Sequence, residues 1–439
     1  MSDRESSRYI QPPSAPASQE ASGLSLDMLV QLALKTLLLS GALTGTQLAS
    51  RLGLPFGVIE PALEVIKTER QCEISGGGML GSSAYQYRIT DAGRTRAALF
   101  LEQNHYVGRA PVPLDQYRRY MVAFHDAVRF QATRARVQQA FSHLVLSDHV
   151  LDQIGPAINA GHSMFVYGPP GNGKTVISRA IGNLLVGEVA IPHALEVEGS
   201  IIRVFDPVSH EAVPQPMSGD SLDEGVRFDQ RWVLCRRPVV MVGGELTLDA
   251  LDLSFSPSTG FYRAPIQMVA NGGVLVIDDF GRQACAPRDL LNRWIVPLES
   301  RVDFMSLGTG QKFEVPFTAL VVFATNLKPS DLLDEAFLRR IHYKISAESP
   351  TVQEFIRIFE RCCGERGLDF DRRLPEQLLQ QYYGPRRIPL RGCQPRDLIE
   401  HAVARADYLD EPHRLTYELL EAACASYFVD DAETPAVYA

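Results

Sequence analysis

The spacing of apolar residues in the first hundred positions predicts three helices. Ser25 can cap the first, over 26–40, and Thr44 can cap the second, a short helix over 45–52. A Gly-Leu-Pro turn follows, and a third helix spans about 55–69. The apolar stripe of that third helix consists of Val58, Ile59, Leu63 and Ile66. The pattern predicts a small helical cluster at the front of the chain.

Two short strands and a closing helix follow this cluster. The runs CEIS (72–75) and AYQYRIT (84–90) flank a glycine-rich turn, which predicts a hairpin. The sequence DAGRTRAALFLEQ (91–103) then predicts a further helix. Three helices followed by a hairpin resemble a winged helix-turn-helix, so we assign residues 24–106 to such a domain.

The periodicity changes again after this domain. VGRAPVP is a proline-interrupted linker, and an arginine-rich stretch over 115–141 has helical spacing, so 107–141 is predicted to be a linker and a basic helix. From Leu144 onward short apolar strands alternate with helices, which predicts an α/β fold with a parallel sheet over 142–347. A helical lid is expected over 348–429.

Composition defines the ends of the chain and its general class. Residues 1–23 and 430–439 have few large apolar side chains, so we expect a disordered tail at each end. The chain has 439 residues, is 45% hydrophobic and has a net charge of -9, which gives no global argument for nucleic-acid binding. No apolar run is long enough for a membrane helix or a signal peptide, so we expect a cytoplasmic protein without membrane contact. Seven cysteines without zinc-site spacing are expected to be reduced thiols.

The clearest chemical motif is GPPGNGKT, which fits G-x-x-x-x-G-K-S/T between an apolar strand (MFVY) and a helix. Glycines let the backbone curl so that its N–H groups point at phosphate oxygens. Lys174 places a positive charge on the β- and γ-phosphates, and the Thr175 hydroxyl is a ligand for Mg²⁺. We therefore expect ATP and Mg²⁺ as cofactors. The residues expected to bind the nucleotide are Gly168, Pro169, Pro170, Gly171, Asn172, Gly173, Lys174, Thr175 and Val176.

A second motif, GGVLVIDDFGR (272–282), supplies the acidic half of the site. Its apolar residues predict a buried central strand that ends at Asp278 and Asp279, and ligands bind at this edge of open parallel sheets. Asp278 is expected to hold Mg²⁺ together with Thr175, directly or through water. Asp279 is the candidate base that orients the attacking water.

These motifs, in this order, resemble the AAA+ superfamily over roughly residues 140–430. The resemblance implies further site residues. Asn326, at the end of the strand TALVVFATN, matches the sensor 1 residue. The segment LDEAFLRRIHYKI (333–345) is similar to the box that contains the arginine finger, which is Arg340 in the first interpretation and Arg339 in the alternative. GCQPRDLIEHAVARA (392–406) resembles the lid helix in which Arg396 would reach the γ-phosphate as sensor 2.

The resemblance also implies a branch of the superfamily and an assembly. A strand, an LGTG turn and a second strand precede the sensor 1 strand, which is similar to the branch with a pre-sensor-1 hairpin: MoxR-like ATPases, McrB-like motors, MCM helicases and sigma-54 activators. The GAFTGA loop of the sigma-54 activators is absent. An arginine finger acts on a neighbour's site, so a self-assembled ring, most simply a hexamer, is expected.

Three functions remain open at this point. The first is a ring-forming motor that uses ATP hydrolysis to remodel a protein partner. The second is a DNA-directed ATPase or a transcription-related regulator; against it, residues 24–106 have seven Lys/Arg and seven Asp/Glu, although Arg88, Arg94 and Arg96 could form a small basic patch. The third is a slow ATP-binding switch, because most AAA+ members have Glu where this chain has Asp279 and the shorter carboxylate reaches less far. The DNA-replication initiator ATPases also have an Asp-Asp pair at this position.

Overall fold

The computed structural model describes residues 12–75, 81–128, 132–214, 228–332 and 338–428. Contacts divide the chain into two compact units, and the segments of the two units alternate along the sequence. Unit 1 comprises 1–130, 185–277 and 282–321, and unit 2 comprises 131–184, 278–281 and 322–439. The predicted tail at 430–439 lies outside the described residues.

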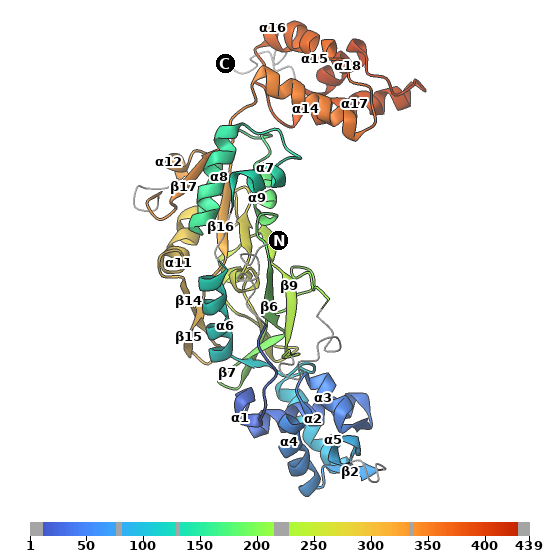
Figure 1. Cartoon of the computed structure of the whole chain (residues 1–439), viewed down its shortest axis with the longest axis vertical. Coiled ribbons are helices and arrows are strands. Elements are labelled where there is room, and N and C mark those ends of the chain that lie inside the picture. Colours follow the sequence, from blue (N-terminus) through green and yellow to red (C-terminus); the bar gives the residue numbers. More distant parts are fainter. Residues whose placement is uncertain (1–11, 76–80, 129–131, 215–227, 333–337, 429–439) are drawn as a thin grey trace, which may run out of the picture. The chain divides into compact units, whose positions relative to one another are not determined.

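The front domain of unit 1 forms the predicted helices and hairpin. Helices α2 to α5 gather around a small antiparallel sheet with the strand order β1-β3-β2 (Figure 1). Their bounds are α2 Leu26–Ser40, β1 Leu43–Thr44, α3 Gly45–Leu52, α4 Phe56–Thr68, β2 Cys72–Ser75, β3 Gln86–Ile89 and α5 Asp91–Gln103. Ser25 accepts from Met28 N, and Thr44 forms a capping box with Gln47, so the predicted caps begin both helices.

The expectation of disorder over residues 1–23 is wrong for residues 12–23, while residues 1–11 lie outside the described part. Helix α1 (Gln19–Ser22) is capped by Ser18, and the Ser22 carbonyl accepts from the buried Arg231 guanidinium at 2.9 Å. The composition underestimates how ordered this segment is, because it takes account only of the apolar surface that the segment itself can bury. Here backbone hydrogen bonds to distant residues hold it in place.

The linker and basic helix are also more ordered and more divided than expected. Within the linker, β4 (Val112–Pro113) pairs in parallel with β7 (Ala194–Val197), so the linker is part of a sheet. The helix predicted over 115–141 is two helices, α6 (Leu114–Ala127) and α7 (Arg134–Ala140). Residues 129–131, between them, lie outside the described residues.

The rest of unit 1 is rich in strands. A mixed sheet has the order β11-β12-β8-β7-β4, and β6 pairs with β9. The hairpin predicted before the strand TALVVFATN is present as antiparallel β14 and β15. The bounds are β6 Glu188–Pro192, β8 Ser200–Arg203, β9 Trp232–Arg236, β11 Ser254–Ser256, β12 Phe261–Arg263, α10 Ile266–Val269, α11 Pro287–Ser300, β14 Val302–Ser306 and β15 Lys312–Pro316. Short 3₁₀ turns occupy Ser82–Ala84 and Leu248–Leu251.

The predicted α/β fold is confirmed by a five-stranded sheet in the order β10-β13-β16-β5-β17, whose described pairings are parallel. Its strands are β5 Met164–Tyr167, β10 Val239–Val242, β13 Val274–Ile277, β16 Leu320–Thr325 and β17 Tyr343–Ser346. All residues of β13 and β16 are buried, as central strands of a parallel sheet require.

Unit 2 also contains several helices, of which the later ones form a helical region toward the C-terminus. The helices are α8 Asp148–Ala160, α9 Lys174–Gly182, α12 Pro329–Leu332, α14 Val352–Glu365, α15 Arg373–Leu378, α16 Gly384–Arg386, α17 Gln394–Tyr408 and α18 Tyr417–Tyr427, with a π-helical turn at Leu379–Tyr383. Helices α14, α15, α17 and α18 share one apolar core with the π-helical turn, and this core includes Phe355, Leu398 and Leu420. This region falls where the helical lid was predicted.

Candidate nucleotide site

The phosphate-binding motif forms a loop between β5 and α9, as its sequence context predicts. Gly168, Gly171 and Gly173 have φ of 148°, 79° and 75°, a backbone region that favours glycine. A Cβ at position 168 would lie 2.3 Å from the Ala347 carbonyl oxygen, whereas at Gly173 it would meet nothing within 4 Å. The loop is therefore packed on one side and open at Gly173, beside the N-terminus of α9, where an anion is favoured.

The side chains of Lys174 and Thr175 begin α9 and face the acidic strand end. The Thr175 hydroxyl donates to Asp278 Oδ2 at 2.7 Å. Lys174 is 7% exposed, and its ammonium donates to the Pro169 carbonyl at 2.8 Å. Burial lowers the pKa of Lys174, while the nearby carboxylates of Asp279 and Asp278 oppose that shift. The structure thus brings the basic and acidic halves of the predicted site together.

The second aspartate occupies an unusual backbone conformation. Asp279 has φ of 49°, a left-handed region that non-glycine residues rarely adopt and that Asp tolerates better than most. Its side chain is exposed and accepts from the Asn326 amide at 2.8 Å. Left-handed residues often lie at functional sites, where the surrounding structure holds them. The two residues predicted to handle the attacking water are therefore neighbours.

Two further hydrogen bonds hold the turn that contains Asp279. Phe280 N donates to the Ala324 carbonyl at 2.7 Å, and the Thr325 hydroxyl donates to the Phe280 carbonyl at 2.7 Å. Thr325 is fully buried, and the Phe280 ring packs on Phe165 and Phe323. This anchoring fixes the Asp279 backbone directly beside the strand that ends at Asn326.

The loop also contacts the residue after β17 and the segment just before α17, through residues that the sequence analysis did not single out for this role. Asn172 donates to the Ala347 carbonyl at 3.2 Å and accepts from Gly392 N at 3.2 Å, while Cys393 N donates to the Gly171 carbonyl at 2.8 Å. Arg391 is close enough to Lys174 to lower the pKa of that lysine further. These contacts join segments that lie far apart in the sequence. The only sequence signal for them is the identity of the residues at the x positions of the loop motif, such as Asn172.

The candidate sensor 2 residue takes a different partner in this structure. The Arg396 guanidinium donates to Asp397 Oδ1 through Nε at 3.0 Å and Nη2 at 2.9 Å, and its side chain is 61% exposed. This pairing raises the pKa of Arg396. The cationic side chain beside the loop is that of Arg391, which donates to Ser349 Oγ at 2.8 Å.

The two candidate finger residues come directly after Leu338, and residues 333–337 of their segment lie outside the described residues. Arg339 is exposed and Arg340 is half-buried, with its carbonyl accepting from the Ser163 hydroxyl at 3.4 Å. A finger acts on the site of a neighbouring chain, so its assignment stays a prediction. Of the rest of the predicted loop, Pro170 and Val176 are exposed and Pro169 is half-buried.

These residues fit a nucleoside triphosphate and its magnesium ion. Mg²⁺ prefers oxygen ligands, and the Thr175 hydroxyl and Asp278 carboxylate lie close enough together to serve one ion. The glycine turn, Lys174 and the open N-terminus of α9 provide the donors and positive charge that phosphates require. The side chains that would bind the nucleotide and the ion lie on one edge of the sheet.

Comparisons with known proteins give one match to a family and several to solved structures. Residues 351–426, in the helical region, match the family described as "Domain of unknown function (DUF8689)". No curated protein sequence matches the chain.

Two similar solved structures are the RuvB Holliday junction branch migration motor of Thermotoga maritima and NtrX of Brucella abortus. The first is 15% identical with a TM-score of 0.35, over 64% of this chain and 69% of RuvB. The second is 14% identical with a TM-score of 0.40, over 72% of this chain and 64% of NtrX. Likeness at this level adds no argument about the fold or function of the chain, which rest on its own geometry. Within its described residues, every helix is too short or too polar to span a bilayer.

Proposed function

We propose that this chain is an AAA+ ATPase that binds ATP with Mg²⁺ and assembles into a ring, where hydrolysis drives the remodelling of a protein partner. The observation that supports the ATPase activity best is the hydrogen bond of 2.7 Å between Thr175 Oγ1 and Asp278 Oδ2. It joins a phosphate-binding loop to an acidic strand end 103 residues away. The order of motifs over residues 140–430 supports the superfamily.

Each side chain has a defined part in this chemistry. Lys174 and the loop N–H groups bind the β- and γ-phosphates, and Thr175 with Asp278 would hold Mg²⁺, which neutralises phosphate charge when bound. A water attacks the γ-phosphorus, the bond from that phosphorus to the bridging oxygen of ADP breaks, and Asp279 accepts the proton of the water. The Asn326 amide, 2.8 Å from Asp279 Oδ1, positions that carboxylate and the water.

The ring and its finger complete the proposal. Arg340, with Arg339 as the alternative, would stabilise the charge on the phosphoryl group bound by the neighbouring chain. Loss of the γ-phosphate would remove this contact and let neighbouring chains rotate. The contacts from Asn172 to Ala347 and Gly392 would pass the state of the loop to the helical region.

Replacement of the loop lysine tests the ATPase proposal directly. We expect Lys174→Ala to abolish ATP binding, measured by calorimetry with MgATP, and to abolish phosphate release. Arg179→Ala, an exposed change on the same helix α9, serves as the matched control and should leave both unchanged. Normal MgATP binding by a folded Lys174→Ala protein would overturn the assignment of this loop.

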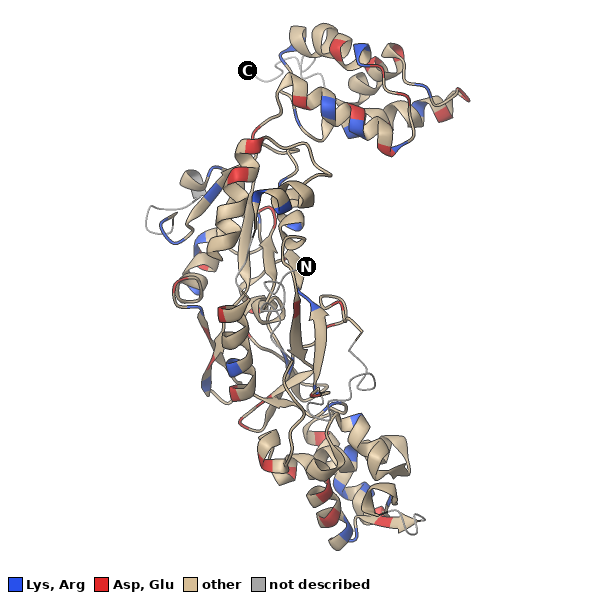
Figure 2. Cartoon of the chain, viewed as in Figure 1, with Lys and Arg blue, Asp and Glu red and all other residues tan. Residues whose placement is uncertain are grey.

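A DNA-directed ATPase is the second candidate, and the described arrangement of helices and strands in residues 24–106 supports it. The charges of the domain favour a protein partner instead. Figure 2 shows Lys/Arg and Asp/Glu interspersed over these elements, and Lys67 pairs with Glu64 at 3.1 Å on α4. Arg88 and Arg94 also lie 3.9 Å from acids, Glu73 and Asp91. Paired cations attract phosphates weakly.

The kind of partner that stimulates or binds the ATPase distinguishes the two candidate functions. Duplex DNA that raises the ATPase rate in a salt-sensitive way supports the second. A protein retained by the hydrolysis-deficient Asp279→Asn variant in the presence of ATP, and released by Lys174→Ala, supports the first. A turnover rate that no partner raises would favour the slow ATP-binding switch.

A further inference from the structure

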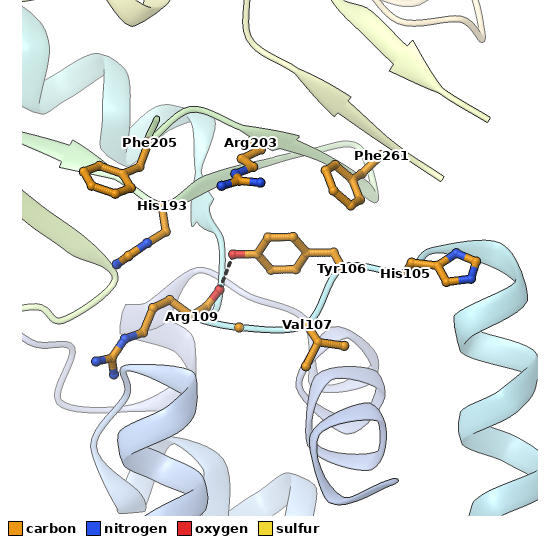
Figure 3. Close-up of a pocket in the computed structure, with 9 residues that line it drawn as sticks. His105, Tyr106, Val107, Arg109, His193, Arg203, Phe205 and Phe261 are labelled. Atoms are coloured by element: carbon orange, nitrogen blue, oxygen red, sulfur yellow. Dashed lines mark hydrogen bonds between the residues drawn. The ribbon is translucent and has the colours of Figure 1, made fainter. Parts of the chain in front are cut away.

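A cavity of about 300 Å³ lies within unit 1, between the end of the front domain and the mixed sheet. One wall is the segment after α5, with Tyr106 and Arg109. The opposite wall consists of His193 before β7, Arg203 at the end of β8, Phe205, and Phe261 at the start of β12 (Figure 3). A volume of this size is at the lower end of small-molecule sites. The nucleotide site lies entirely in unit 2, so this cavity is separate from it.

The walls of the cavity are held together by the backbone. His105 N donates to the Thr259 carbonyl at 2.8 Å, and Ala110 N donates to the Leu52 carbonyl at 2.7 Å. The Tyr106 hydroxyl donates to the Arg109 carbonyl at 2.6 Å and is 8% exposed as a residue. These bonds fix the segment on both sides of the cavity, so its shape is preorganised.

The lining is positive and contains no carboxylate. Its two guanidinium groups belong to Arg109 and Arg203, and none of the lining residues is Asp or Glu. Arg263, the register partner of Arg203 on β12, adds a third cation beside them. Within the described part of the chain, neither Arg203 nor Arg263 forms an ion pair. Like charges gathered without a counter-charge favour the binding of an anion.

The positive surroundings also affect the pKa of His193, one of the histidines in the lining. Burial, followed by the charges of Arg109 and Arg203, lowers the pKa of His193 to about 4. At neutral pH the ring is therefore uncharged and can accept or donate one hydrogen bond. Its ring lies 5.3 Å from that of Phe205.

The two arginines of the lining, Arg109 and Arg203, play different roles. Arg109 donates to the Ser50 carbonyl and, at 3.2 Å, to the Gln230 side chain, so its guanidinium is turned toward protein acceptors and supplies a fixed charge. Arg203 lies between Phe205 and Phe261, with its guanidinium near the Tyr106 hydroxyl (Figure 3). A planar guanidinium in this position can bind a carboxylate or phosphate through two parallel N–H bonds.

The remaining wall is aromatic. Tyr106 and Phe261 meet edge to face, with ring centroids 5.9 Å apart, and Phe205 closes the other end. Such rings flank the exposed Arg203 and offer faces and edges against which a flat ring can pack. The combination selects for a molecule with one planar ring and one anionic group.

We propose that this cavity binds a small aromatic anion, with a carboxylate or phosphate on Arg203 and a planar ring against Phe205 and Phe261. The ligand contacts both the front domain and the mixed sheet, so its binding stabilises their mutual arrangement within unit 1. The site is independent of ATP.

Calorimetry with the full chain tests this proposal, using benzoate and phenyl phosphate as probes in a buffer free of other oxyanions. All proteins include Lys174→Ala, so that phosphate cannot occupy the loop of the nucleotide site. We expect at least one probe to bind with one site per chain, and the better of the two identifies the anionic group. Inorganic phosphate and benzyl alcohol, which each lack one half of the ligand, should bind at least about tenfold more weakly.

Two variants localise the binding. Arg203→Gln should weaken the better probe at least about tenfold, because a charge-assisted pair of bonds is lost. Arg88→Gln, the matched control, removes the same charge from an exposed position on β3 outside the lining and should change the affinity less than about threefold. Arg203→Lys keeps the charge without the planar fork and should give an intermediate loss. Unchanged thermal unfolding midpoints verify that each variant is folded.

Three results would overturn the proposal: no saturable binding of either probe, equal binding by Arg203→Gln, or inorganic phosphate binding as tightly as phenyl phosphate. None of them bears on ATP hydrolysis, which Lys174→Ala removes from every protein in the comparison.

Discussion

The candidate base Asp279 combines a left-handed backbone with a carboxylate held by Asn326. A non-glycine residue in this region typically costs about 1–2 kcal/mol, which Asp and Asn reduce by local hydrogen bonding. The Asp278 carboxylate also holds this turn, because Asp279 N donates to Asp278 Oδ1 at 3.0 Å. The same turn therefore orders both carboxylates.

Removal of the base without disturbance of the turn is the sharpest test of its role. Asp279→Asn keeps a side chain that tolerates this backbone, so we expect ATP affinity to change less than about threefold while kcat falls by about 10²–10⁴. Single-turnover phosphate release and calorimetry measure the two effects. Asp279→Ala should additionally lower the unfolding midpoint, since alanine tolerates the left-handed backbone less well and cannot accept the hydrogen bond from the Asn326 amide. A turnover rate retained in Asp279→Asn would assign the base elsewhere.

A second single-residue effect concerns a buried cation in the front domain. Lys35 on α2 is 1% exposed, and its ammonium donates to the Asn104 carbonyl at 3.1 Å. Burial lowers its pKa from 10.5 to about 8. The unfolded chain therefore binds the proton more tightly, so the free energy of unfolding rises with pH between about 8 and 10.5. Below about pH 8 the full cost of the buried charge is present.

Lys35→Met should remove this cost. We expect the free energy of unfolding of the front domain to rise by about 1–3 kcal/mol at pH 7, and the gain over the natural chain to shrink as pH rises from about 8 to 10.5. Urea unfolding at pH 7 and pH 10 measures this difference. Lys67→Met, an exposed change in the same domain, should have little effect at either pH. An equal loss of stability by Lys35→Met at both pH values would contradict the role of burial.

At the scale of elements, a buried ion pair connects four segments of unit 1. Arg231 and Asp229 have side chains that are 1% and 2% exposed, and their charged atoms lie 2.8 Å apart. The guanidinium also donates to the Ser22 carbonyl at the end of α1, to Gln116 on α6 and to the linker carbonyl of Pro111. Its charge is thus compensated by one carboxylate and distributed over several acceptors.

Loss of one partner of the Arg231–Asp229 pair should destabilise unit 1. Asp229→Asn leaves the buried guanidinium without a counter-charge, so we expect a decrease of about 3–5 kcal/mol in the free energy of unfolding of unit 1, measured by denaturant titration. The matched control is Glu211→Gln, which disrupts the exposed pair with Arg236, whose side chains are 70% and 67% exposed. That change should cost less than about 1 kcal/mol. Similar losses in both variants would show that burial is not what makes the first pair important.

The phosphate loop and the helical region form another connection between elements. Asn172→Ala removes one donor and one acceptor that bridge Ala347 and Gly392. Two lost hydrogen bonds weigh about 1–3 kcal/mol, so we expect ATP affinity to fall by about 5- to 100-fold. Arg179→Ala, an exposed change on the adjoining helix α9, is the control for calorimetry. Unaltered ATP binding in Asn172→Ala would separate the loop from the helical region.

At the scale of the whole molecule, the proposed ring predicts how a mixture of two inactive variants will behave. Lys174→Ala removes the nucleotide site of a chain, and Arg340→Ala removes its finger, so each variant alone should be inactive. In mixed rings, an intact Lys174 site can meet an intact Arg340 from the neighbour, and ATPase activity should reappear. Sedimentation with a non-hydrolysable ATP analogue reports the assembly itself.

The outcome of the mixture is decisive for the finger. Activity that stays absent after mixing, with both variants sedimenting as rings, would exclude Arg340 as a residue that acts in trans, and Arg339→Ala would take its place in the same assay. Chains that remain monomeric at saturating nucleotide would exclude the ring.

The sequence by itself determined what depends on consecutive residues. The caps of α2 and α3, the glycine turn before Lys174, the strand that ends at Asp278 and the hairpin of β14 and β15 all follow from local periodicity and turn chemistry. Tertiary structure decided what joins distant residues: Asn326 with Asp279 at a separation of 47, Asn172 with Gly392 at 220, and the ordering of 12–23 by Arg231. The physical reason is that these hydrogen bonds form only after the chain has closed long loops, so no local pattern of apolar and polar positions records them.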